Sequence, residues 1–389
     1  MHCGGARNML HRTPLYQEHV AIGAHLVEFA GWEMPLSFSG IVSEHEAVRT
    51  SAGAFDVSHM ANIVIRGPSA IEIVTRAFTN DIHRSEPGKA KYTHLLTEKG
   101  RILDDMIVTR IAEDEFLCVA NASMRKPVSD VLRSLGPEGA VEDISMHCAA
   151  VAIQGPKSRE IVARIFGDGA VELKPFWTKF VEIRKEWKVT NGAQGGDHGV
   201  TYHHIESGDY VFVSRTGYTG EEGFEIIIPF RAAPALWYEA IGKGELRAMP
   251  VGLGARDTLR LEMGYLLSGQ DFHGDRTTLE TGYDWVVKWD HDFIGREALE
   301  AQKAAGGYQH FVGLFVDGQK VPRHGYAIMD GDRNVGTITS GTQSPTLRQG
   351  IALGYVDAAL ALPGTALSID IRGARSTAKV VKPPFIKKK

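Results

Sequence analysis

Hydrophobic and polar residues alternate along several short stretches of this chain, and turn residues separate these stretches. Residues 61–66 (ANIVIR) alternate as a strand, and after the turn signal Gly67–Pro68 a helix is predicted over about 69–78. Further strands are predicted over 91–96 and 116–120, joined by tight polar turns. Short strands mixed with helices in this way predict an α+β fold.

Two adjacent carboxylates interrupt a stretch that is otherwise typical of a buried strand, GRILDDMIVT (100–109). Because strand side chains alternate between faces, Asp104 and Asp105 are expected on opposite faces. A carboxylate that faces a core must be compensated by hydrogen bonds, a cation or a bound ligand. The alternative is a bulge or strand end that lets both acids reach water.

The pattern also divides the chain into larger parts. A second series of strand, turn and helix begins at 149–153, is followed by Gly155–Pro156, and repeats the pattern of 63–68. From residue 311 onward, short strands separated by Gly and Pro turns predict a separate small β-barrel or jelly roll. Residues 179–205 shift from charged to glycine-rich to histidine-rich, which indicates an insertion.

The insertion contains three histidines, His198, His203 and His204. Adjacent histidines on a strand point to opposite faces, and no acidic or cysteine ligand is suitably spaced beside them. We therefore expect no metal.

Composition narrows the function classes. A chain of 389 residues with 43% hydrophobic residues is long enough for two or three domains. The formal net charge of -4 gives no general electrostatic case for binding nucleic acid or an anionic membrane, and no apolar run approaches membrane-spanning length. The isolated cysteines Cys3, Cys118 and Cys148 offer no disulfide framework. These features predict a cytoplasmic protein.

Glycines at 217, 220 and 223 in SRTGYTGEEGFEIIIP (214–229) have the spacing of a phosphate loop. A phosphate loop precedes a helix, whereas a strand follows here, so a ligand with hydrogen-bond donors fits better. A ring with an N–H and an exocyclic amine would match the Glu225 carboxylate, and Tyr218 would supply an aromatic surface or a hydroxyl. The alternative is an ordinary hairpin with a surface acid.

Two other polar positions allow both a structural and a binding interpretation. In VGLGARDTLRLEMGYLLSGQDF (251–272), charges spaced three and four residues apart suit ion pairs on a helix, yet one arginine near a pocket could bind a ligand carbonyl or carboxylate. Asn121 follows the strand 116–120, where it could cap the next helix or bind a ligand.

The chain closely resembles the T-protein (aminomethyltransferase) family of the glycine cleavage system, and the resemblance covers nearly all of it in order. Besides the stretches above, it rests on FAGWEMPLSF (29–38), FDVSHM (55–60), QGPKSREI (154–161), DFIGREAL (292–299) and SGTQSPTLRQGIALGYV (340–356). The resemblance implies a three-domain cloverleaf of mixed and antiparallel sheets around a tetrahydrofolate site. The implied domains are 1–65 with 149–285, 66–148, and a C-terminal jelly-roll-like β-barrel over 290–389.

The implied reaction takes the aminomethyl group from the lipoyl arm of the H-protein, transfers its methylene to tetrahydrofolate, and releases ammonia and 5,10-methylenetetrahydrofolate. By this resemblance Asp104 matches the catalytic aspartate and Asp105 is structural. The folate-binding residues that it implies are Tyr218 and Glu225 at the pterin, Arg256 and Asn121 in the same cavity, and Tyr92 and Met60 in blocks near the site.

Three features depart from the family pattern. Arg101 follows Gly100 where the family commonly has a second glycine, and Ser268 takes the place of the tyrosine in a block that ends in Leu-Tyr-Gly in many relatives. The insertion has no counterpart in compact members of the family. Two other functions in the same superfamily remain alternatives. Folate-dependent demethylases tend not to keep the Asp104–Asp105 pair. Non-enzymatic folate-binding proteins linked to iron–sulfur cluster assembly carry a cysteine signature that does not occur here.

Overall fold

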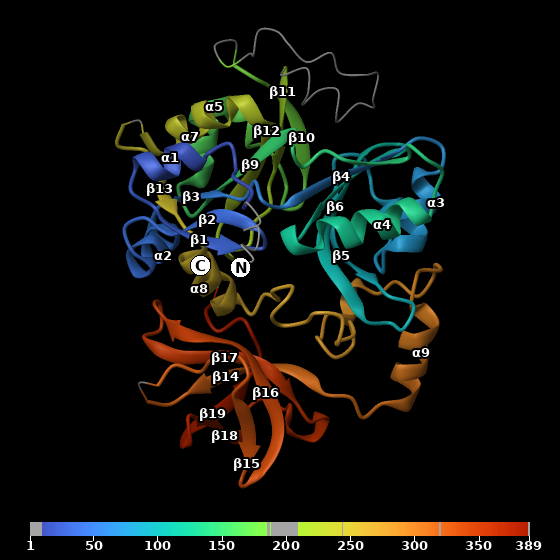
Figure 1. Ribbon diagram of the computed structural model, residues 1–389, viewed down its shortest axis with the longest axis vertical. Coiled ribbons are helices and arrows are strands. Elements are labelled where there is room, and N and C mark those ends of the chain that lie inside the picture. The colour runs from blue at the N-terminus through green and yellow to red at the C-terminus, as the bar shows by residue number, and fades with distance from the viewer. Residues whose placement is uncertain (1–9, 185–186, 188–208, 243, 319, 388–389) are drawn as a thin grey trace, which may run out of the picture.

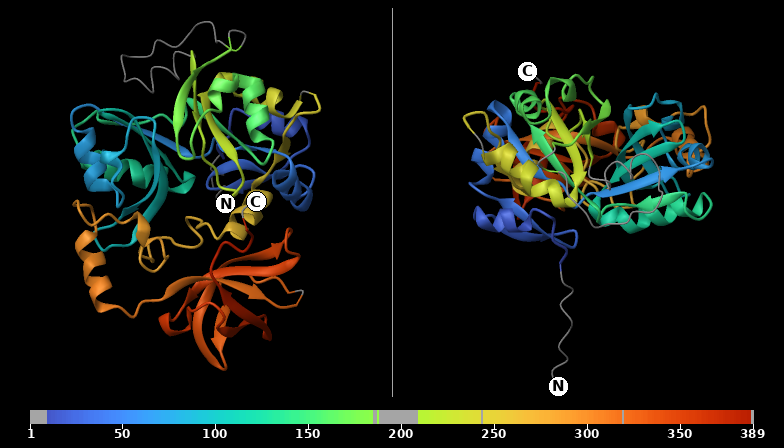
Figure 2. Two further views of the ribbon diagram at one scale, coloured as in Figure 1. Left: turned by 180° about the vertical axis from the view of Figure 1, so that it is seen from behind. Right: turned by 90° about the horizontal axis from the view of Figure 1, so that it is seen from above.

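A computed structural model describes residues 10–184, 187, 209–242, 244–318 and 320–387. It shows three lobes around a common centre, two of them α/β lobes that lie side by side and the third a β-barrel (Figure 1). The view from above in Figure 2 shows the two α/β lobes next to each other in a flattened molecule. The three histidines of the predicted insertion lie outside the described residues.

The first lobe is built on a six-stranded sheet that is assembled from distant parts of the chain. Its strands, in spatial order, are β10 (Thr178–Glu182), β11 (Tyr210–Ser214), β12 (Gly223–Pro229), β9 (Cys148–Gln154), β3 (Gly53–Asp56) and β13 (Met249–Val251). Neighbouring strands are antiparallel except β13 and β3. Because β10 begins at Thr178, the first residues of the predicted insertion belong to this sheet, and any inserted segment starts after it.

Side chains of this sheet alternate between two cores. Val151 and Ile153 of β9 face helices α5 (Ser158–Phe166) and α7 (Ala233–Gly242). Ala150 and Ala152 face the opposite way, toward helices α2 (Ile41–Thr50) and α8 (Leu253–Met263). The shorter elements α1 (Tyr16–Ala21), β1 (His25–Phe29) and β2 (Trp32–Ser37) complete this lobe. Burial on both faces explains why β9 is apolar at every position from 148 to 153.

The second lobe is a five-stranded antiparallel sheet with helices α3 (Ala70–Ala77) and α4 (Arg125–Ser134) on one face. Its strands, in order, are β5 (Ala90–Leu96), β6 (Ile102–Ala112), β7 (Glu115–Ala120), β4 (Ala61–Arg66) and β8 (Val141–Asp143). Strand β4 pairs with β7 and β8, so this lobe begins near residue 61 and the predicted boundary after 65 is wrong. Local alternation identifies the strand but not its pairing partners.

The strand, turn and helix series repeats as predicted. In both α/β lobes a buried strand ends at a Gly-Pro turn and a helix packs back on the sheet, β4 before α3 and β9 before α5. The two sheets also share a core, in which Val64 and Leu117 from the second lobe pack with Phe55 and Phe212 from the first. The face of the second sheet that points away from α3 and α4 therefore turns toward the first lobe.

The third lobe is a closed six-stranded barrel, which confirms the predicted C-terminal β-barrel. Its strands, in order, are β14 (His310–Val316), β17 (Gln349–Val356), β16 (Arg333–Ser344), β15 (Ala327–Asp330), β18 (Ala366–Ile371) and β19 (Ala374–Val381). Between α8 and β14 the chain passes along the second lobe in a largely irregular segment, residues 264–295, and then forms helix α9 (Arg296–Ala305). We call residues 264–295 the connecting segment.

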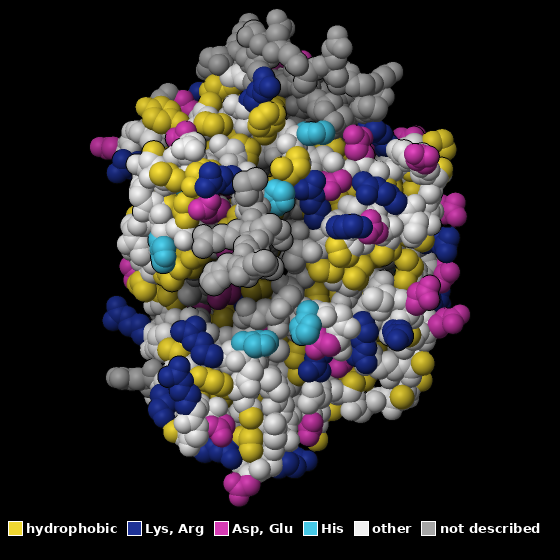
Figure 3. Space-filling model, viewed as in Figure 1, with side chains coloured by type: hydrophobic (Ala, Val, Ile, Leu, Met, Phe, Trp, Pro, Cys, Tyr) yellow, Lys and Arg dark blue, Asp and Glu magenta, His cyan; other side chains and the backbone are white. Residues whose placement is uncertain are grey.

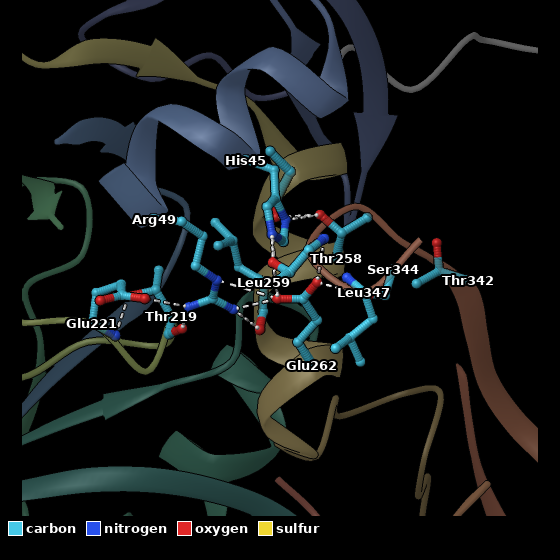
Figure 4. Close-up of polar contacts among 12 residues, drawn as sticks. His45, Arg49, Thr219, Glu221, Thr258, Leu259, Glu262, Thr342, Ser344 and Leu347 are labelled. Carbon is cyan, nitrogen blue, oxygen red and sulfur yellow. Dashed lines mark hydrogen bonds and ion pairs between the residues drawn. The ribbon is translucent and has the colours of Figure 1, made fainter. Parts of the chain in front are cut away.

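A buried carboxylate on α8 fastens the barrel to the first lobe (Figure 4). Glu262 accepts hydrogen bonds from Ser344 Oγ and from the backbone N–H and hydroxyl of Thr346 at the barrel turn. On the other side it pairs with Arg49 Nη2 at 2.8 Å and lies 3.2 Å from His45 Nε2, both on α2. Burial alone would raise the pKa of Glu262, but hydrogen bonds and charges from these partners lower it to about 2.

We predict that Glu262→Gln lowers the free energy of unfolding by about 3 kcal/mol at pH 7, because it leaves the partly buried Arg49 guanidinium facing a neutral amide and weakens the hydrogen bonds from the barrel turn. Glu33→Gln, which breaks an exposed ion pair with Arg12, serves as the control and should cost less than about 1 kcal/mol. Urea unfolding of both variants measures the difference.

The pH dependence gives a second readout of the same variant. Because the folded-state pKa of Glu262 lies below the ordinary value of 4.5, its stabilisation is present above that value and is lost as pH falls toward about 2. The gap between wild type and Glu262→Gln should therefore narrow from pH 6 to pH 3. A gap that stays constant over this range would contradict the role of the Glu262 charge.

Candidate functional site

The two adjacent carboxylates of β6 lie on opposite faces of the second sheet, as alternation predicts. Asp104 lies on the face of α3 and α4 and has no exposed surface. Its Oδ1 accepts hydrogen bonds from Asn121 Nδ2 and Ser268 Oγ, each at 2.8 Å, and its Oδ2 accepts one from the Asn121 backbone N–H at 3.0 Å. Protein groups thus occupy both oxygens of Asp104.

Asp105 lies on the other face, toward the first lobe, and is only half-buried. Its Oδ2 accepts a hydrogen bond of 2.6 Å from the Tyr92 hydroxyl, and its Oδ1 accepts one of 2.9 Å from Asn121 Nδ2. The two acids thus differ in their surroundings: Asp104 is buried and bound through both oxygens, whereas Asp105 is partly exposed on the face toward the first lobe. The sequence expectation that Asp104 is catalytic and Asp105 structural stays a prediction. A register shift between β5 and β6 lies beside Asp104, but Asp104 stays fully buried, so the alternative in which a bulge lets both acids reach water is wrong.

Asn121 holds this pair together rather than capping a helix. Its side chain makes no capping hydrogen bond, and its Nδ2 donates to Asp104 Oδ1, to Asp105 Oδ1 and to the Asp105 backbone carbonyl. Burial raises the pKa of both carboxyl groups, and the charge of Asp105 adds to this for Asp104. Hydrogen bonds from Asn121 to both acids, and from Tyr92 to Asp105, oppose the rise.

The first lobe contributes three of the predicted residues, which form a second group. Arg256, on α8, places its guanidinium 4.9 Å from the centre of the Tyr218 ring. The Tyr218 ring stacks on the Tyr265 ring with 5.7 Å between the ring centres, and the Tyr218 hydroxyl donates to the Leu266 carbonyl of the connecting segment. Burial lowers the pKa of Arg256, and the charge of the nearby Glu225 opposes this effect. These contacts confirm that residues far apart in the sequence meet at this position.

The two groups face each other closely enough to interact electrically. Burial raises the pKa of Tyr218, and the negative charge of Asp105 adds to the rise. Glu225 is half-buried on β12, and its Oε2 accepts a hydrogen bond of 2.5 Å from Thr216 Oγ1. Arg256 Nη1 is buried and has no hydrogen-bond partner among the described residues. A half-buried acceptor on Glu225 and an unpaired buried donor on Arg256 therefore belong to the group of first-lobe residues around Tyr218.

Aromatic side chains line the site next to Asp105. The Tyr92 ring stacks with the Trp285 ring and contacts the Tyr283 ring, with 5.9 Å and 5.6 Å between the ring centres. Trp285 itself is 56% exposed. Met60, half-buried between β3 and β4, packs against the core shared by the two sheets. The structure thus places Tyr92 in the carboxylate group and Met60 against the core that the two sheets share.

The glycines of the 214–229 stretch have a packing role that the sequence pattern does not reveal. A Cβ atom at Gly217 or Gly223 would lie 1.9 or 2.3 Å from the side chain of Gln154. Gln154 is fully buried, donates to the Thr216 carbonyl and accepts from Thr219 Oγ1. The glycines therefore make room for an amide that holds the Tyr218 loop.

Two of the residues that depart from the family pattern, Arg101 and Ser268, have defined contacts in the structure. Arg101 Nη1 donates to the Asp275 carbonyl and to Glu280 Oε2, so its charge is taken up by the connecting segment rather than by the site. Ser268 lies within the site and donates to Asp104. Sequence reasoning assigned no role to Ser268 or Gln154, because each is a single polar residue without a motif of its own.

Other kinds of site are not evident in the part of the chain that the structure describes. No group of three or more His, Cys, Asp or Glu side chains could hold a metal ion there. In the same residues, no helix is both long and apolar enough to cross a membrane. On the face shown in Figure 3, basic and acidic side chains are interspersed.

These features define a three-lobed α+β protein in which a carboxylate pair of the second lobe and an arginine–tyrosine group of the first lobe lie near each other. The chain matches the model of the GCVT N-terminal domain over residues 15–191 and 199–291, and that of the glycine cleavage T-protein C-terminal barrel domain over residues 309–387. The chain therefore belongs to the glycine cleavage T-protein family.

Individual relatives agree over nearly their full lengths. An aminomethyltransferase of Halothermothrix orenii is 39% identical over 96% of this chain and 99% of its own, and one of Nostoc sp. is 40% identical over 97% and 96%. The crystal structure of the glycine cleavage system aminomethyltransferase T from Bartonella henselae superposes with a TM-score of 0.86 at 32% identity, covering 98% of this chain and 99% of that one. The protein is accordingly an enzyme of the aminomethyltransferase class.

We predict that Gly217→Ala destabilises the protein by roughly 1 to 3 kcal/mol, because the new methyl group displaces Gln154 from the Tyr218 loop. Gly169→Ala is the matched control, since a Cβ there meets nothing within 4 Å. Thermal melts compare the two variants. Equal melting temperatures would mean that the Gln154 contact does not restrict position 217.

Proposed function

We propose that this enzyme transfers the methylene of an aminomethyl group, carried on the lipoyl arm of an H-protein, to tetrahydrofolate. The bonds from the transferred carbon to sulfur and to the amine nitrogen break, and the carbon forms bonds to two folate nitrogens. Each of these folate nitrogens loses one proton. One proton ends on the lipoyl thiol and the other on ammonium, and 5,10-methylenetetrahydrofolate is the product. The observation that carries the proposal is a half-buried carboxylate, Asp105, which faces ligand-binding groups from another lobe.

The chemistry of tetrahydrofolate suits the groups that surround Asp105. Its pterin ring offers an N–H and an amino group, which the half-buried Glu225 carboxylate can accept, and a carbonyl, which the unpaired Nη1 of Arg256 can bind. Tyr218 and Trp285 provide aromatic surfaces for flat rings. We propose that these residues hold folate, together with Tyr92, Asn121 and Met60 as the lining expected from the sequence.

Within this site we propose Asp105, rather than Asp104, as the catalytic carboxylate. Methylene transfer requires a folate N–H to lose its proton, and positive charge develops as the amine leaves. A carboxylate beside these atoms can accept the proton and stabilise that charge. Burial raises the pKa of Asp105 toward neutrality, which suits a group that must both take up and release a proton near pH 7.

In this proposal Asp104 does not contact the reacting atoms and acts through its neighbours. Its two oxygens bind Asn121 and Ser268, and Asn121 in turn orients Asp105. Asp104 is therefore a positioning residue that joins the second lobe to the connecting segment. The direct assignment of Asp104 as the catalytic aspartate would require it to break these hydrogen bonds and leave a buried face.

We predict that Asp105→Asn lowers single-turnover ammonia release by about 10² to 10⁴-fold at saturating tetrahydrofolate, because the amide can neither accept the proton nor carry the charge. Asp104→Asn is the matched control. It should lower stability by roughly 1 to 3 kcal/mol and affect turnover less. The assay mixes aminomethylated H-protein with each variant and measures ammonia alongside thermal melts.

Two outcomes would count against this account. A larger turnover loss in Asp104→Asn than in Asp105→Asn would return the catalytic role to Asp104. Wild-type enzyme that releases no ammonia from aminomethylated H-protein, yet transfers a methyl group from a sulfonium donor to tetrahydrofolate, would favour the demethylase alternative.

We also predict that Glu225→Gln weakens tetrahydrofolate binding ten- to a hundredfold, because an amide cannot accept both pterin donors and presents a donor of its own. Glu160→Gln, an exposed glutamate on α5, should leave the affinity unchanged. Isothermal titration calorimetry measures both. Wild-type affinity in Glu225→Gln would remove Glu225 from the folate site.

A further inference from the structure

A buried histidine lies directly behind the Tyr92–Asp105 hydrogen bond. His94 pairs with Asp105 across β5 and β6 and shares a sheet face with Tyr92, two residues earlier. It has no exposed surface. Its Nε2 lies 3.3 Å from the Tyr92 hydroxyl, and its Nδ1 lies 2.9 Å from Thr278 Oγ1 of the connecting segment. Four groups thus form one chain of hydrogen bonds, from Thr278 through His94 and Tyr92 to Asp105.

The donor and acceptor of each hydrogen bond in this chain follow from the ionised state of Asp105. An ionised Asp105 can only accept, so the Tyr92 hydroxyl donates its single proton to Asp105 Oδ2. The Tyr92 oxygen is then an acceptor for His94, and Nε2 must carry the imidazole proton. Burial lowers the pKa of His94 to about 3, so the ring stays neutral and its bare Nδ1 accepts from the Thr278 hydroxyl.

His94 is also fixed by packing. Its ring stacks near the Tyr283 ring at 6.1 Å and lies 6.5 Å from the Phe272 ring, while Tyr92 is held separately by Trp285. The position of Tyr92 therefore does not depend on His94 alone. Removing the imidazole takes a donor away from the Tyr92 oxygen and leaves the aromatic contacts of Tyr92 with Trp285 and Tyr283 in place.

We propose that His94 is a positioning residue for the reaction, which sets the basicity of Asp105 through Tyr92. A donor to the Tyr92 oxygen polarises the Tyr92 hydroxyl and strengthens its hydrogen bond to the Asp105 carboxylate, and a stronger bond favours the charged form. The Thr278 hydroxyl supplies the donor that this tautomer needs at Nδ1. A protonated Asp105 lacks the charge toward which these hydrogen bonds are directed, so the donor at the Tyr92 oxygen favours the ionised form of Asp105.

Other groups near Asp105 are unchanged by substitutions at position 94. The titratable side chains that act on Asp105 are Asp104 on its own strand, Tyr92 on β5, Asp271 and Tyr283 on the connecting segment, and Tyr218 on the first lobe. His94 contacts Tyr92 within this set and has a ring contact with Tyr283. A change in the Asp105 pKa in a His94 variant therefore reports mainly on the Tyr92 hydrogen bond.

The test measures the pKa of Asp105 without substrate, although the catalytic meaning of that pKa rests on the proposed function. Infrared spectra over a pH series follow the carboxylic acid C=O band of Asp105, which Asp105→Asn assigns by difference. His94→Leu, which removes the donor, should raise the Asp105 pKa by roughly 0.5 to 1 pH unit. His94→Gln keeps an N–H donor and should restore most of the wild-type value.

Kinetics and a second position complete the test. The pH profile of single-turnover ammonia release should shift in the same direction in His94→Leu, with unchanged tetrahydrofolate affinity. Thr278→Val should give a smaller upward shift and Thr278→Ser none, which covers the case in which His94→Leu does not fold. Equal shifts in the Leu and Gln variants, or an unmoved Asp105 pKa in both His94→Leu and Thr278→Val, would overturn the proposal. A protein without aminomethyltransferase activity would still show the infrared shift.

Discussion

One amide group holds two adjacent carboxylates at the centre of the molecule, and the rest of the site is built around that constraint. Asn121 Nδ2 lies 2.8 Å from Asp104 Oδ1 and 2.9 Å from Asp105 Oδ1. Burying two neighbouring acids is costly unless each has enough donors. Those donors come from different places, Tyr92 on β5 and Ser268 on the connecting segment. The hydrogen bonds of the carboxylate pair are therefore complete only when the second lobe and the connecting segment are both in place.

A second set of buried contacts explains how the lobes keep that arrangement. Glu262 binds the barrel turn on one side and Arg49 on the other, and Arg49 Nη1 also donates to the Thr219 carbonyl and to Glu221 (Figure 4). Thr219 follows Tyr218 directly in the sequence. The contact that fastens the barrel thus also restrains the loop that carries Tyr218, so stability and the position of Tyr218 depend on the same charged groups.

Much of this architecture could be predicted from local pattern, and the failures share one physical cause. Alternation and Gly-Pro turns identify β4, β9 and their helices, and they place Asp104 and Asp105 on opposite faces. They do not show which face meets the ligand, because that depends on where α3 and α4 pack. The predicted domain boundary after residue 65 is wrong because β4 pairs with β7 and β8, which lie far away in the sequence. His94 and Gln154 were missed because a single buried polar residue has no sequence motif, and its partners lie far away in the chain.

The central claim is that Asp105 faces the reacting atoms while Asp104 supports it from behind. A crystal structure of the protein with tetrahydrofolate bound tests this claim most directly. The account predicts an Asp105 carboxylate oxygen within hydrogen-bonding distance of a reduced-ring nitrogen of folate, with Asp104 still bound to Asn121 and Ser268. A complex in which Asp104 contacts the folate, and Asp105 points away from it, would contradict the account.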